Sequence, residues 1–345
     1  MPGFPTSLPD SRVPDPATAP PLRWGILATG GIARTFVTAL AAHTTQRVVA
    51  VGSRSAERAR AFAGAHGIEH AHGSYDALVG DPDVDVVYVA TPHSEHRDNA
   101  LSAIAAGKHV LVEKSFTRNA AEAAEVFEAA RSAGVFVMEA MWARFLPQMD
   151  VLRQLLADGA LGDIAVVAAD HGQYFDFDPA HRLFNPDLAG GAMLDLGIYP
   201  VSFAAMVLGA PEAVTATGTV TSTGVDAQVA MVLDKGAAQA VLYTTLLAAT
   251  PTTAAVSGTV ARADLSGRFY SPGTLTITSR DGSVLTRERD DIVGSAGLCY
   301  EAAEVARCIT TGRRESRLLG WGETLSIMKT MDEIRRQIGV TLPGE

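Results

Sequence analysis

An alternation of short apolar strands with helical segments across residues 22–141 constrains the fold of this chain most strongly. Six segments read as strands, and each is preceded or followed by a helical segment: LRWGIL, RVVAVGS, IEHAH, VDVVYVA, HVLVE and VFVME. Alternation of this kind produces βαβ units, whose strands pair in a doubly wound parallel sheet. We therefore predict an N-terminal α/β domain over residues 22–141.

The turn after the first strand has the composition of a dinucleotide-binding turn in a Rossmann fold. It reads Ala28-Thr29-Gly30-Gly31-Ile32-Ala33, a G-x-G-x-x-A fingerprint whose first glycine is replaced by alanine. Gly30 lets the backbone approach a pyrophosphate, and the unpaired amides at the start of the next helix attract the anion. A plain turn without a nucleotide is the alternative. The strand-turn-helix context and the second strand favour nucleotide binding.

The end of the second strand indicates which nucleotide is bound. NAD enzymes place an acidic residue there for the ribose 2′-hydroxyl, whereas an arginine accommodates the 2′-phosphate of NADP. This chain has Ser53 and Arg54 at that point and no carboxylate until Glu57. Because a phosphate gains charge-assisted hydrogen bonds from arginine, we predict NADP as the cofactor, with NAD less favoured. Arg58, one turn into the next helix, is either a second phosphate ligand or a solvated helix residue.

Two segments far apart in the sequence carry residues suited to proton transfer. HVLVEKS (109–115) delivers Lys114 to the carboxyl end of a buried strand, the rim where open α/β sheets bind ligands. GGAMLDLGIYP (190–200) places Asp195 and Tyr199 four residues apart, on one face of a helix. A tyrosine hydroxyl is a poor base at neutral pH, but an ammonium group beside it favours the phenolate. The structural alternative is a salt-bridged lysine, a helix-capping aspartate and a packed tyrosine.

These segments together resemble the family of glucose-fructose oxidoreductase, inositol dehydrogenase and the rhizopine-catabolism proteins, abbreviated Gfo/Idh/MocA. The likeness covers roughly residues 22–338, and its landmarks are GILATGGIA (25–33), VGSR (51–54), GSYDAL (73–78), DPDVDVVYVATPHSEH (81–96), AGKHVLVEKS (106–115), MEAMWARFLP (138–147) and GGAMLDLGIYP. Several of these segments are similar to the branch that contains dihydrodiol dehydrogenase and NADP-dependent D-xylose 1-dehydrogenase. Inositol dehydrogenases commonly have histidine where Tyr199 stands, so the chain resembles the tyrosine branch.

The resemblance implies an NADP-dependent oxidoreductase that transfers hydride between the nicotinamide and a hydroxyl-bearing carbon of a sugar or cyclic diol. It places Lys114, Asp195 and Tyr199 in the family's catalytic positions. Alternatives are a reductase of 1,5-anhydrofructose or another keto sugar, an inositol dehydrogenase-like enzyme, and a cofactor-sensing regulator, since the family includes a repressor. Retention of all three residues favours an enzyme.

Two residues depart from the family pattern. Ser115 follows Lys114 where the family has proline, and the lysine-proline bond of relatives is often cis, so the isomer of the Lys114-Ser115 bond is left open. Ala28 replaces the first glycine of the fingerprint. Because alanine is the smallest alternative to glycine, we expect cofactor binding to survive this change.

Further site residues are predicted around the cofactor and the substrate. Thr91 and Pro92, in the turn after the fourth strand, and Glu113 are expected to line the cofactor site. His96 begins the next helix and is expected to face the cleft, where it binds cofactor or a substrate hydroxyl; a histidine bonded to the backbone is the alternative. Trp142 and Arg144 suit a polyhydroxylated ring, with packing between domains as the alternative. A far wall is a weaker prediction, formed by Asp170, His171, Tyr174 and Arg182.

The rest of the chain predicts a second domain and a tail. From residue 142 the sequence gives one helix and then alternating Val, Thr and Ala runs, which indicate an open-faced, mainly antiparallel sheet. We assign residues 142–345 to this α+β domain for substrate binding and oligomerisation. The residues on one face of its sheet are small and apolar, as in a subunit interface. Residues 1–21 contain seven prolines and are expected to form a flexible tail or to lie over a neighbouring subunit.

Composition narrows the class of protein. A formal net charge of −10 argues against nucleic acid as a partner, and no apolar run of eighteen residues predicts a membrane span. Cys299 and Cys308 are too far apart for a redox or zinc motif, and no His/Asp/Glu cluster has metal-ligand spacing. We therefore expect a cytoplasmic homodimer or larger oligomer that needs no metal. The exact substrate, the carbon oxidised and the direction of reaction are not predicted.

Overall fold

The computed structural model describes residues 3–345, and these form two compact units. The parallel-sheet unit comprises residues 14–144 and 294–325, and the mixed-sheet unit comprises residues 3–13, 145–293 and 326–345. The predicted domain boundary at residue 142 lies near the change of unit at residue 145. Residues 294–325, in contrast, belong to the parallel-sheet unit, because helix α8 (Leu298–Thr310) packs against helix α1 (Gly31–His43) of that unit.

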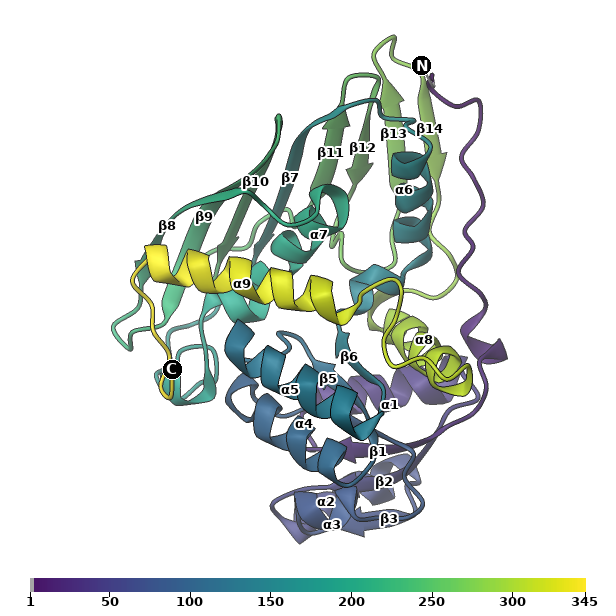
Figure 1. Cartoon of the computed structure of the whole chain (residues 1–345), viewed down its shortest axis with the longest axis vertical. Coiled ribbons are helices and arrows are strands. Elements are labelled where there is room, and N and C mark those ends of the chain that lie inside the picture. Colours follow the sequence, from purple (N-terminus) through teal and green to yellow (C-terminus); the bar gives the residue numbers. More distant parts are fainter. Residues whose placement is uncertain (1–2) are drawn as a thin grey trace. The chain divides into compact units, whose positions relative to one another are not determined.

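The parallel-sheet unit has the predicted doubly wound sheet. Its six strands are all parallel and lie in the order β3-β2-β1-β4-β5-β6. They are β1 (Arg23–Leu27), β2 (Arg47–Gly52), β3 (His70–His72), β4 (Val86–Val89), β5 (His109–Glu113) and β6 (Val137–Ala140). Helices α4 (His96–Ala105) and α5 (Ala120–Ala133) lie side by side on this sheet (Figure 1). The fold class predicted for this region is confirmed.

Capping residues set the ends of these helices. Asn119 accepts a hydrogen bond from the Glu122 N–H at 2.9 Å, which satisfies an amide in the first turn of α5. Gly134 ends α5 with φ 70°, the left-handed conformation that favours glycine. Ser55 and Ser74 cap helices α2 (Ala56–His66) and α3 (Tyr75–Val79) in the same way.

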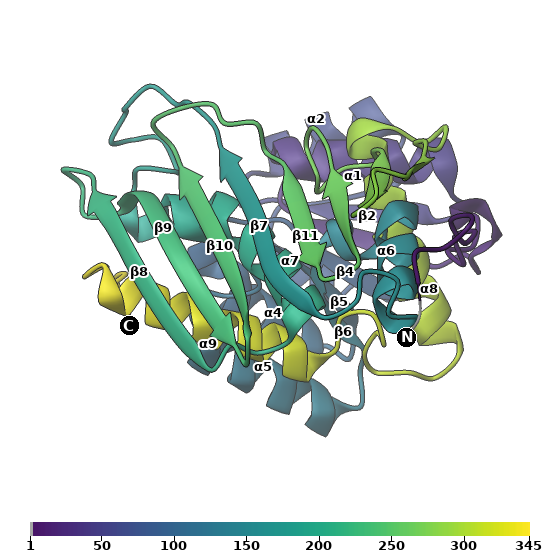
Figure 2. The same cartoon turned by 90° about the horizontal axis from the view of Figure 1, so that it is seen from above.

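The mixed-sheet unit is built on eight strands in the order β14-β13-β12-β11-β7-β10-β9-β8 (Figure 2). The strands are β7 (Ile164–Gly172), β8 (Ala213–Val220), β9 (Asp226–Lys235), β10 (Ala238–Thr245), β11 (Ala254–Gly258), β12 (Ala261–Leu265), β13 (Leu275–Ser279) and β14 (Val284–Arg287). The sheet is mainly antiparallel, as predicted, but β7 and β10 pair in parallel. Two local details differ from the sequence prediction. The run 252–265 forms two strands, and β14 was not predicted.

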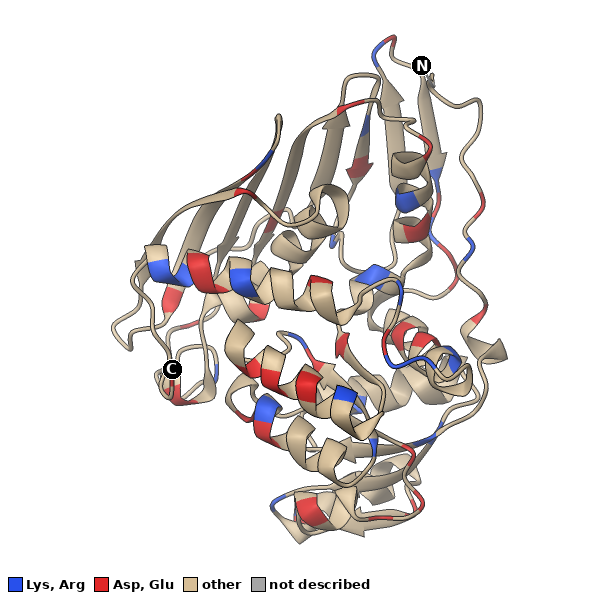
Figure 3. Cartoon of the chain, in the orientation of Figure 1, with Lys and Arg blue, Asp and Glu red and all other residues tan. Residues whose placement is uncertain are grey.

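One face of this sheet is covered and the other is open. In β10 the side chains of Ala240 and Leu242 are buried, whereas Val241 and Tyr243 between them are 48% and 42% exposed. Helix α7 (Ile198–Leu208) packs against β7 and β10, and the end of α9 (Trp321–Gln337) is bound to β8 through Gln337. Figure 3 shows few charged residues along these strands. The exposed face of the sheet therefore carries mainly small and apolar side chains. Helix α6 (Pro147–Ala157) belongs to the same unit.

One helical stretch, Pro186–Leu208, is long and apolar enough to cross a membrane by length and composition. Its mean hydropathy is 1.6. Because Asp195 interrupts the stretch, it contains no unbroken apolar run of eighteen residues, and the sequence therefore did not predict it. Because 78% of its window is buried inside the chain, the stretch has the properties of a core helix.

Residues 3–21 differ from the flexible tail that the prolines predict. In the mixed-sheet unit, Arg12 forms an ion pair with Asp150 of α6 at 2.9 Å. In the parallel-sheet unit, the carbonyl of Asp15 accepts a hydrogen bond from Arg307 of α8 at 2.7 Å, and a 3-10 helix covers Pro16–Thr18. Proline fixes φ, so the segment loses little further backbone freedom when side chains bind its carbonyls.

Candidate active site

The dinucleotide turn of the parallel-sheet unit is open where an anion would approach. Gly30 precedes α1 without any side-chain cap, so the first amides of the helix have no side-chain acceptor at that position. A Cβ atom built on Gly30 or Gly31 meets no other atom within 4 Å, which leaves space above the turn. Ala28 adopts φ 92°, a conformation that strains any residue with a Cβ and explains why the fingerprint places glycine there.

Positive charge gathers at the end of β2, as the sequence predicts for NADP. Ser53 is buried directly after the strand, and Arg54 is exposed. Burial raises the pKa of the nearby Tyr75 phenol, whereas the guanidinium groups of Arg54 and Arg58 lower it. Both arginines therefore lie near the same phenol, beside the N-terminus of α2, and Arg58 is exposed, as a solvated helix residue would be.

The loop that carries Lys114 follows β5 and is held by buried side chains. The Lys114-Ser115 peptide bond, which the sequence left open, is cis. Glu113 accepts the Lys114 N–H at 3.2 Å, and His93 contacts the Lys114 carbonyl at 3.2 Å. Glu139 of β6 accepts the Phe116 N–H at 3.1 Å. The main chain on both sides of Lys114 is thus fixed by carboxyl and imidazole groups.

His96 does not face an open cleft. Its side chain is fully buried, and its two ring nitrogens lie 2.9 Å from the carbonyl oxygens of Ser115 and Thr91. Burial lowers the pKa of this imidazole. Because both nitrogens are engaged by main-chain oxygens, the structure supports the alternative of a histidine bonded to backbone. The His96 side chain thus joins the Lys114 loop to the turn that contains Thr91 and Pro92.

Three other predicted ligands are also engaged inside the chain. Glu113 accepts hydrogen bonds from the Tyr88 hydroxyl and from the Lys114 N–H, so both of its oxygens have protein donors rather than a cofactor. Arg144 is buried and forms an ion pair with Glu323 at 2.5 Å, which favours a structural role over the predicted sugar contact. Trp142 is buried as well.

In the mixed-sheet unit, Asp195 lies in a π-helical turn, Met193–Gly197, and Tyr199 lies in the first turn of α7. Single π-helical turns occur frequently at functional sites. The buried carboxylate of Asp226 accepts the Met193 N–H at 2.6 Å and so holds the start of this turn. Gly191 has φ 111°, and a Cβ there would lie 2.2 Å from the Asp226 carboxylate, so only glycine fits.

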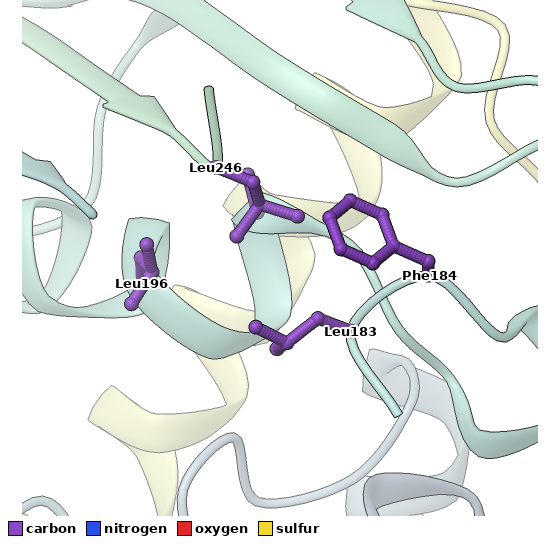
Figure 4. Close-up of a cluster of buried hydrophobic side chains, with 5 residues drawn as sticks. Leu183, Phe184, Leu196 and Leu246 are labelled. Carbon is purple, nitrogen blue, oxygen red and sulfur yellow. The ribbon is translucent and has the colours of Figure 1, made fainter. Parts of the chain in front are cut away.

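Asp195 is paired with Arg182, which the sequence named as a weaker candidate. Two nitrogens of the Arg182 guanidinium lie 2.9 and 3.3 Å from the two Asp195 oxygens. Figure 4 shows an apolar cluster of the same unit, to which Leu183, Phe184, Leu196 and Leu246 contribute. Leu183 and Leu196 adjoin Arg182 and Asp195 in sequence. The cluster therefore anchors both members of the ion pair.

Tyr199 packs against two aromatic rings of the same unit. The ring of Tyr270 stacks on it with centroids 4.4 Å apart, and His171 meets it edge-on at 5.3 Å. Tyr270 was not predicted, because a lone aromatic residue in a loop gives no periodic signal. Of the predicted far wall, Asp170 instead binds the loop residues Thr252 and Thr253, and Tyr174 is exposed.

A second polar cluster lies at the edge strand of the parallel sheet. His70 and His72 contact the same Asp81 oxygen at 2.6 and 2.8 Å, although no metal-ligand spacing was read from the sequence. The sequence missed the group because Asp81 belongs to a different turn of the chain. The two histidine contacts and the Asp83 N–H lower the pKa of Asp81 to about 2 against its desolvation. Hydrogen bonds account for the arrangement, so the cluster carries no metal assignment.

Comparison with known families gives two matches. The pattern of the GFO/IDH/MocA oxidoreductase family, described as having an NAD-binding Rossmann fold, matches residues 22–141. The GFO/IDH/MocA C-terminal domain matches residues 149–264. Together these two regions include Lys114, Asp195 and Tyr199.

Similar proteins cover nearly the whole chain. Trans-1,2-dihydrobenzene-1,2-diol dehydrogenase of Mus musculus is 40% identical over 333 residues, which span 94% of this chain and 99% of the relative. A 3-ketoreductase from Actinomadura kijaniata, solved with NADP and TDP-benzene, is 26% identical, with a TM-score of 0.82 over 92% of this chain and 98% of that one. Aldose-aldose oxidoreductase from Caulobacter crescentus, solved with glycerol, is 27% identical, with a TM-score of 0.82 over 92% and 97%.

Proposed function

Because this chain belongs to the Gfo/Idh/MocA oxidoreductase family, we propose that it is an NADP-dependent dehydrogenase of cyclic diols or sugars. The reaction is hydride transfer between the nicotinamide and a hydroxyl-bearing carbon of the substrate. The observation that carries the proposal is the end-to-end similarity to dihydrodiol dehydrogenases, at 40% identity over 94% of the chain. The arrangement around Tyr199 supports it, because its ring is fixed by stacking on Tyr270 and by edge contact with His171, and a fixed tyrosine hydroxyl is a suitable proton-transfer group.

The residues of the parallel-sheet unit fit NADP. The open turn at Gly30 and the start of α1 would hold the pyrophosphate, since the turn leaves space and the helix offers amides. Arg54 and Arg58 would bind the 2′-phosphate through charge-assisted hydrogen bonds. When bound, the cofactor supplies the carbon that accepts or donates the hydride.

The chain itself handles the proton. In oxidation, Tyr199 removes the proton from the substrate hydroxyl, and in reduction it returns that proton to the carbonyl oxygen. We assign to Lys114 the stabilisation of the phenolate, and to Asp195 the orientation of the lysine and of the substrate hydroxyls. The ion pair with Arg182 favours the charged form of Asp195, because a nearby positive charge stabilises a carboxylate.

A keto-sugar reductase is the second candidate. The 26% identical 3-ketoreductase, which was solved with NADP, favours this direction of the same chemistry. Both candidates use the same proton donor and acceptor, so they differ in substrate and in direction.

A substrate panel tests the proposal. Cyclic trans-diols, aldoses, inositols and anhydrosugars are assayed with NADP and with NAD at 340 nm, and keto sugars are assayed in reverse with NADPH. We expect turnover of a diol or a sugar with NADP. Tight NADP binding without turnover of any compound would contradict the proposal and favour a cofactor-sensing regulator.

We also propose that the chain forms a homodimer through the open face of its mixed sheet. Strands β8, β10 and β11 contain no charged residue, and the exposed Val241 and Tyr243 pair with Val232 and Ala230 across the sheet. A second copy of the same uncharged face is the complementary surface. Light scattering should give a dimer, and Val241→Asp should give a monomer. Val293→Asp, at an exposed position outside the sheet, is the control that should stay dimeric, and a monomeric wild type would overturn the proposal.

A further inference from the structure

The Lys114 loop is fixed by buried acids that the mechanism above does not use. Glu139, at the end of β6, is 1% exposed and accepts the Phe116 N–H at 3.1 Å through one oxygen. Its other oxygen lies 3.4 Å from the Thr324 hydroxyl of α9. A buried carboxyl group that binds a main-chain amide two residues after Lys114 determines where this part of the loop lies.

Two further buried glutamates face Glu139. Glu113 of β5 binds the Lys114 N–H on the other side of the loop. Glu301 of α8 is 0% exposed, and among residues 3–345 neither of its carboxyl oxygens has a hydrogen-bond partner. Strands β5 and β6 and helix α8 therefore place three carboxyl groups in one buried region. The nearby Arg144 guanidinium is the cation that acts on Glu139.

Burial and crowding keep these acids from ionising together. Burial, with Glu113 adding to it, raises the pKa of Glu139 to about 7, against the opposing effects of the Phe116 N–H, Thr324 and Arg144. Burial, with Glu113 and Glu139 adding to it, raises the pKa of Glu301 well above its usual range. A carboxylate accepts an N–H hydrogen bond about twice as strongly as a neutral group does. The strength of the Glu139 bond therefore depends on which acids carry protons.

We propose that Glu139 is a positioning residue for Lys114, and that the charge of its buried carboxyl group determines how firmly the loop is held. The inference rests on the proposed function only in assigning Lys114 to catalysis. Above neutral pH, the Glu139 carboxylate holds the Phe116 amide firmly and fixes the loop. Below neutral pH, the protonated acid holds it weakly, and Lys114 is less well placed.

Kinetics of matched variants test the role. Glu139→Leu removes the acceptor, so kcat should fall by about 10- to 100-fold at every pH, because a small misplacement of a reacting group has effects of that size. Glu139→Gln keeps an amide oxygen for the Phe116 N–H but cannot ionise. It should recover most of kcat and lose the inflection near pH 7. Glu301→Gln should leave that inflection in place, because Glu301 is still protonated when Glu139 ionises and the amide replaces a neutral acid. Glu128→Gln, on the exposed face of α5, is the control.

A second readout does not depend on turnover. The chain has four lysines, Lys108, Lys114, Lys235 and Lys329, so reductive methylation with 13C-formaldehyde gives few NMR signals. The signal lost in Lys114→Arg identifies Lys114. In the wild type, this signal should shift with an inflection near pH 7, and Glu139→Gln should abolish the inflection. This measurement stands even when no substrate is turned over, which separates failure of this inference from failure of the proposed function.

The outcomes are decisive in both directions. A Glu139→Leu protein that is folded by circular dichroism and keeps wild-type kcat would overturn the inference. So would a Lys114 signal whose pH dependence is identical in wild type and Glu139→Gln. Loss of kcat in Glu139→Leu with recovery in Glu139→Gln, at similar thermal stability, supports positioning over a general effect on folding.

Discussion

Two buried carboxyl groups hold the turn that carries Asp195 and the loop that carries Lys114, and their surroundings differ. Asp226 binds the Met193 N–H at the start of the turn that carries Asp195, and Glu139 binds the Phe116 N–H beside Lys114. Both are nearly inaccessible to water. Burial raises the pKa of Asp226 to about 6 and that of Glu139 to about 7.

The difference comes from the neighbours of each acid. Asp226, the first residue of β9, binds the amide at the start of the π-helical turn; burial raises its pKa, while main-chain amides and the Arg335 guanidinium oppose that rise. Glu139 has one amide donor and two carboxyl neighbours, although Arg144 partly offsets them. Amides and one guanidinium thus favour ionisation of Asp226, whereas carboxyl neighbours oppose ionisation of Glu139. Both acids hold main chain, whereas we assign the proposed chemistry to Tyr199 and Lys114.

The largest expected effect tests that division of roles. Tyr199→Phe keeps the ring that stacks on Tyr270 and deletes only the hydroxyl, so folding and NADP affinity should persist. Turnover should fall by about 10² to 10⁴, the usual contribution of general acid or base catalysis. Steady-state kinetics beside thermal unfolding measure this. Near-normal turnover of the folded variant would show that the proton goes elsewhere.

Lys114→Met provides the matched second variant for that prediction. If Lys114 acts through the Tyr199 phenolate, the double variant should be little worse than the worse single variant, because residues that act as a unit are not additive. Multiplicative losses would instead assign the two residues to separate steps.

Asp226→Asn sharpens the comparison of the two supports. Because the folded state raises this pKa from about 4 to about 6, the folded protein binds the proton more tightly than the unfolded chain between those values. The free energy of unfolding therefore falls as pH rises through this window, by about 3 kcal/mol from this group. Urea unfolding at pH 4.5 and pH 7 should show a smaller decrease in Asp226→Asn, with the exposed Asp163→Asn as control. Equal decreases in all three proteins would contradict the assignment.

Arg54→Ala tests the cofactor half. A charge-assisted contact to phosphate contributes roughly 1.5 to 3 kcal/mol, so the wild type should bind NADP at least ten times more tightly than NAD, and the variant should lose most of that preference. Calorimetric titration of both cofactors measures it. Equal dissociation constants in the wild type would remove the case for NADP.

The smallest effect concerns backbone strain at the dinucleotide turn. Ala28→Gly should relieve about 1 to 3 kcal/mol of strain at φ 92°, against about 0.4 to 1 kcal/mol of added freedom in the unfolded chain. We expect a net stabilisation of about 1 kcal/mol in urea unfolding. Ala33→Gly, inside α1, is the control that should lose stability by a similar amount. A destabilised Ala28→Gly would show that the turn carries no strain.

Local patterns predicted much of this structure. The six parallel strands and the apolar outer sheet face follow from residues close in sequence. The segments that carry Lys114 and Tyr199 were found in the same way. Their tests remain those given above.

Contacts between distant segments were less accessible. The parallel pairing of β7 with β10 and the grouping of residues 294–325 with the first unit depend on tertiary packing. The same is true of His96, whose two ring nitrogens lie 2.9 Å from the carbonyl oxygens of Ser115 and Thr91, and of Glu301, whose neighbours lie on other elements. Sequence patterns identify residue types, but they do not show which side chains a folded chain turns inward.

The apolar stretch Pro186–Leu208 has a consequence for how the protein is made. Of the strands that contact it, β7 precedes it on the chain, whereas β9 and β10 follow it and are complete only at residue 245. On the ribosome, this stretch emerges before most of its cover has been synthesised. During that interval the stretch exposes a hydrophobic surface to chaperones and to other nascent chains. Yield of native protein should therefore depend on the rate of translation and on crowding of newly made chains, more than on the stability of the finished fold.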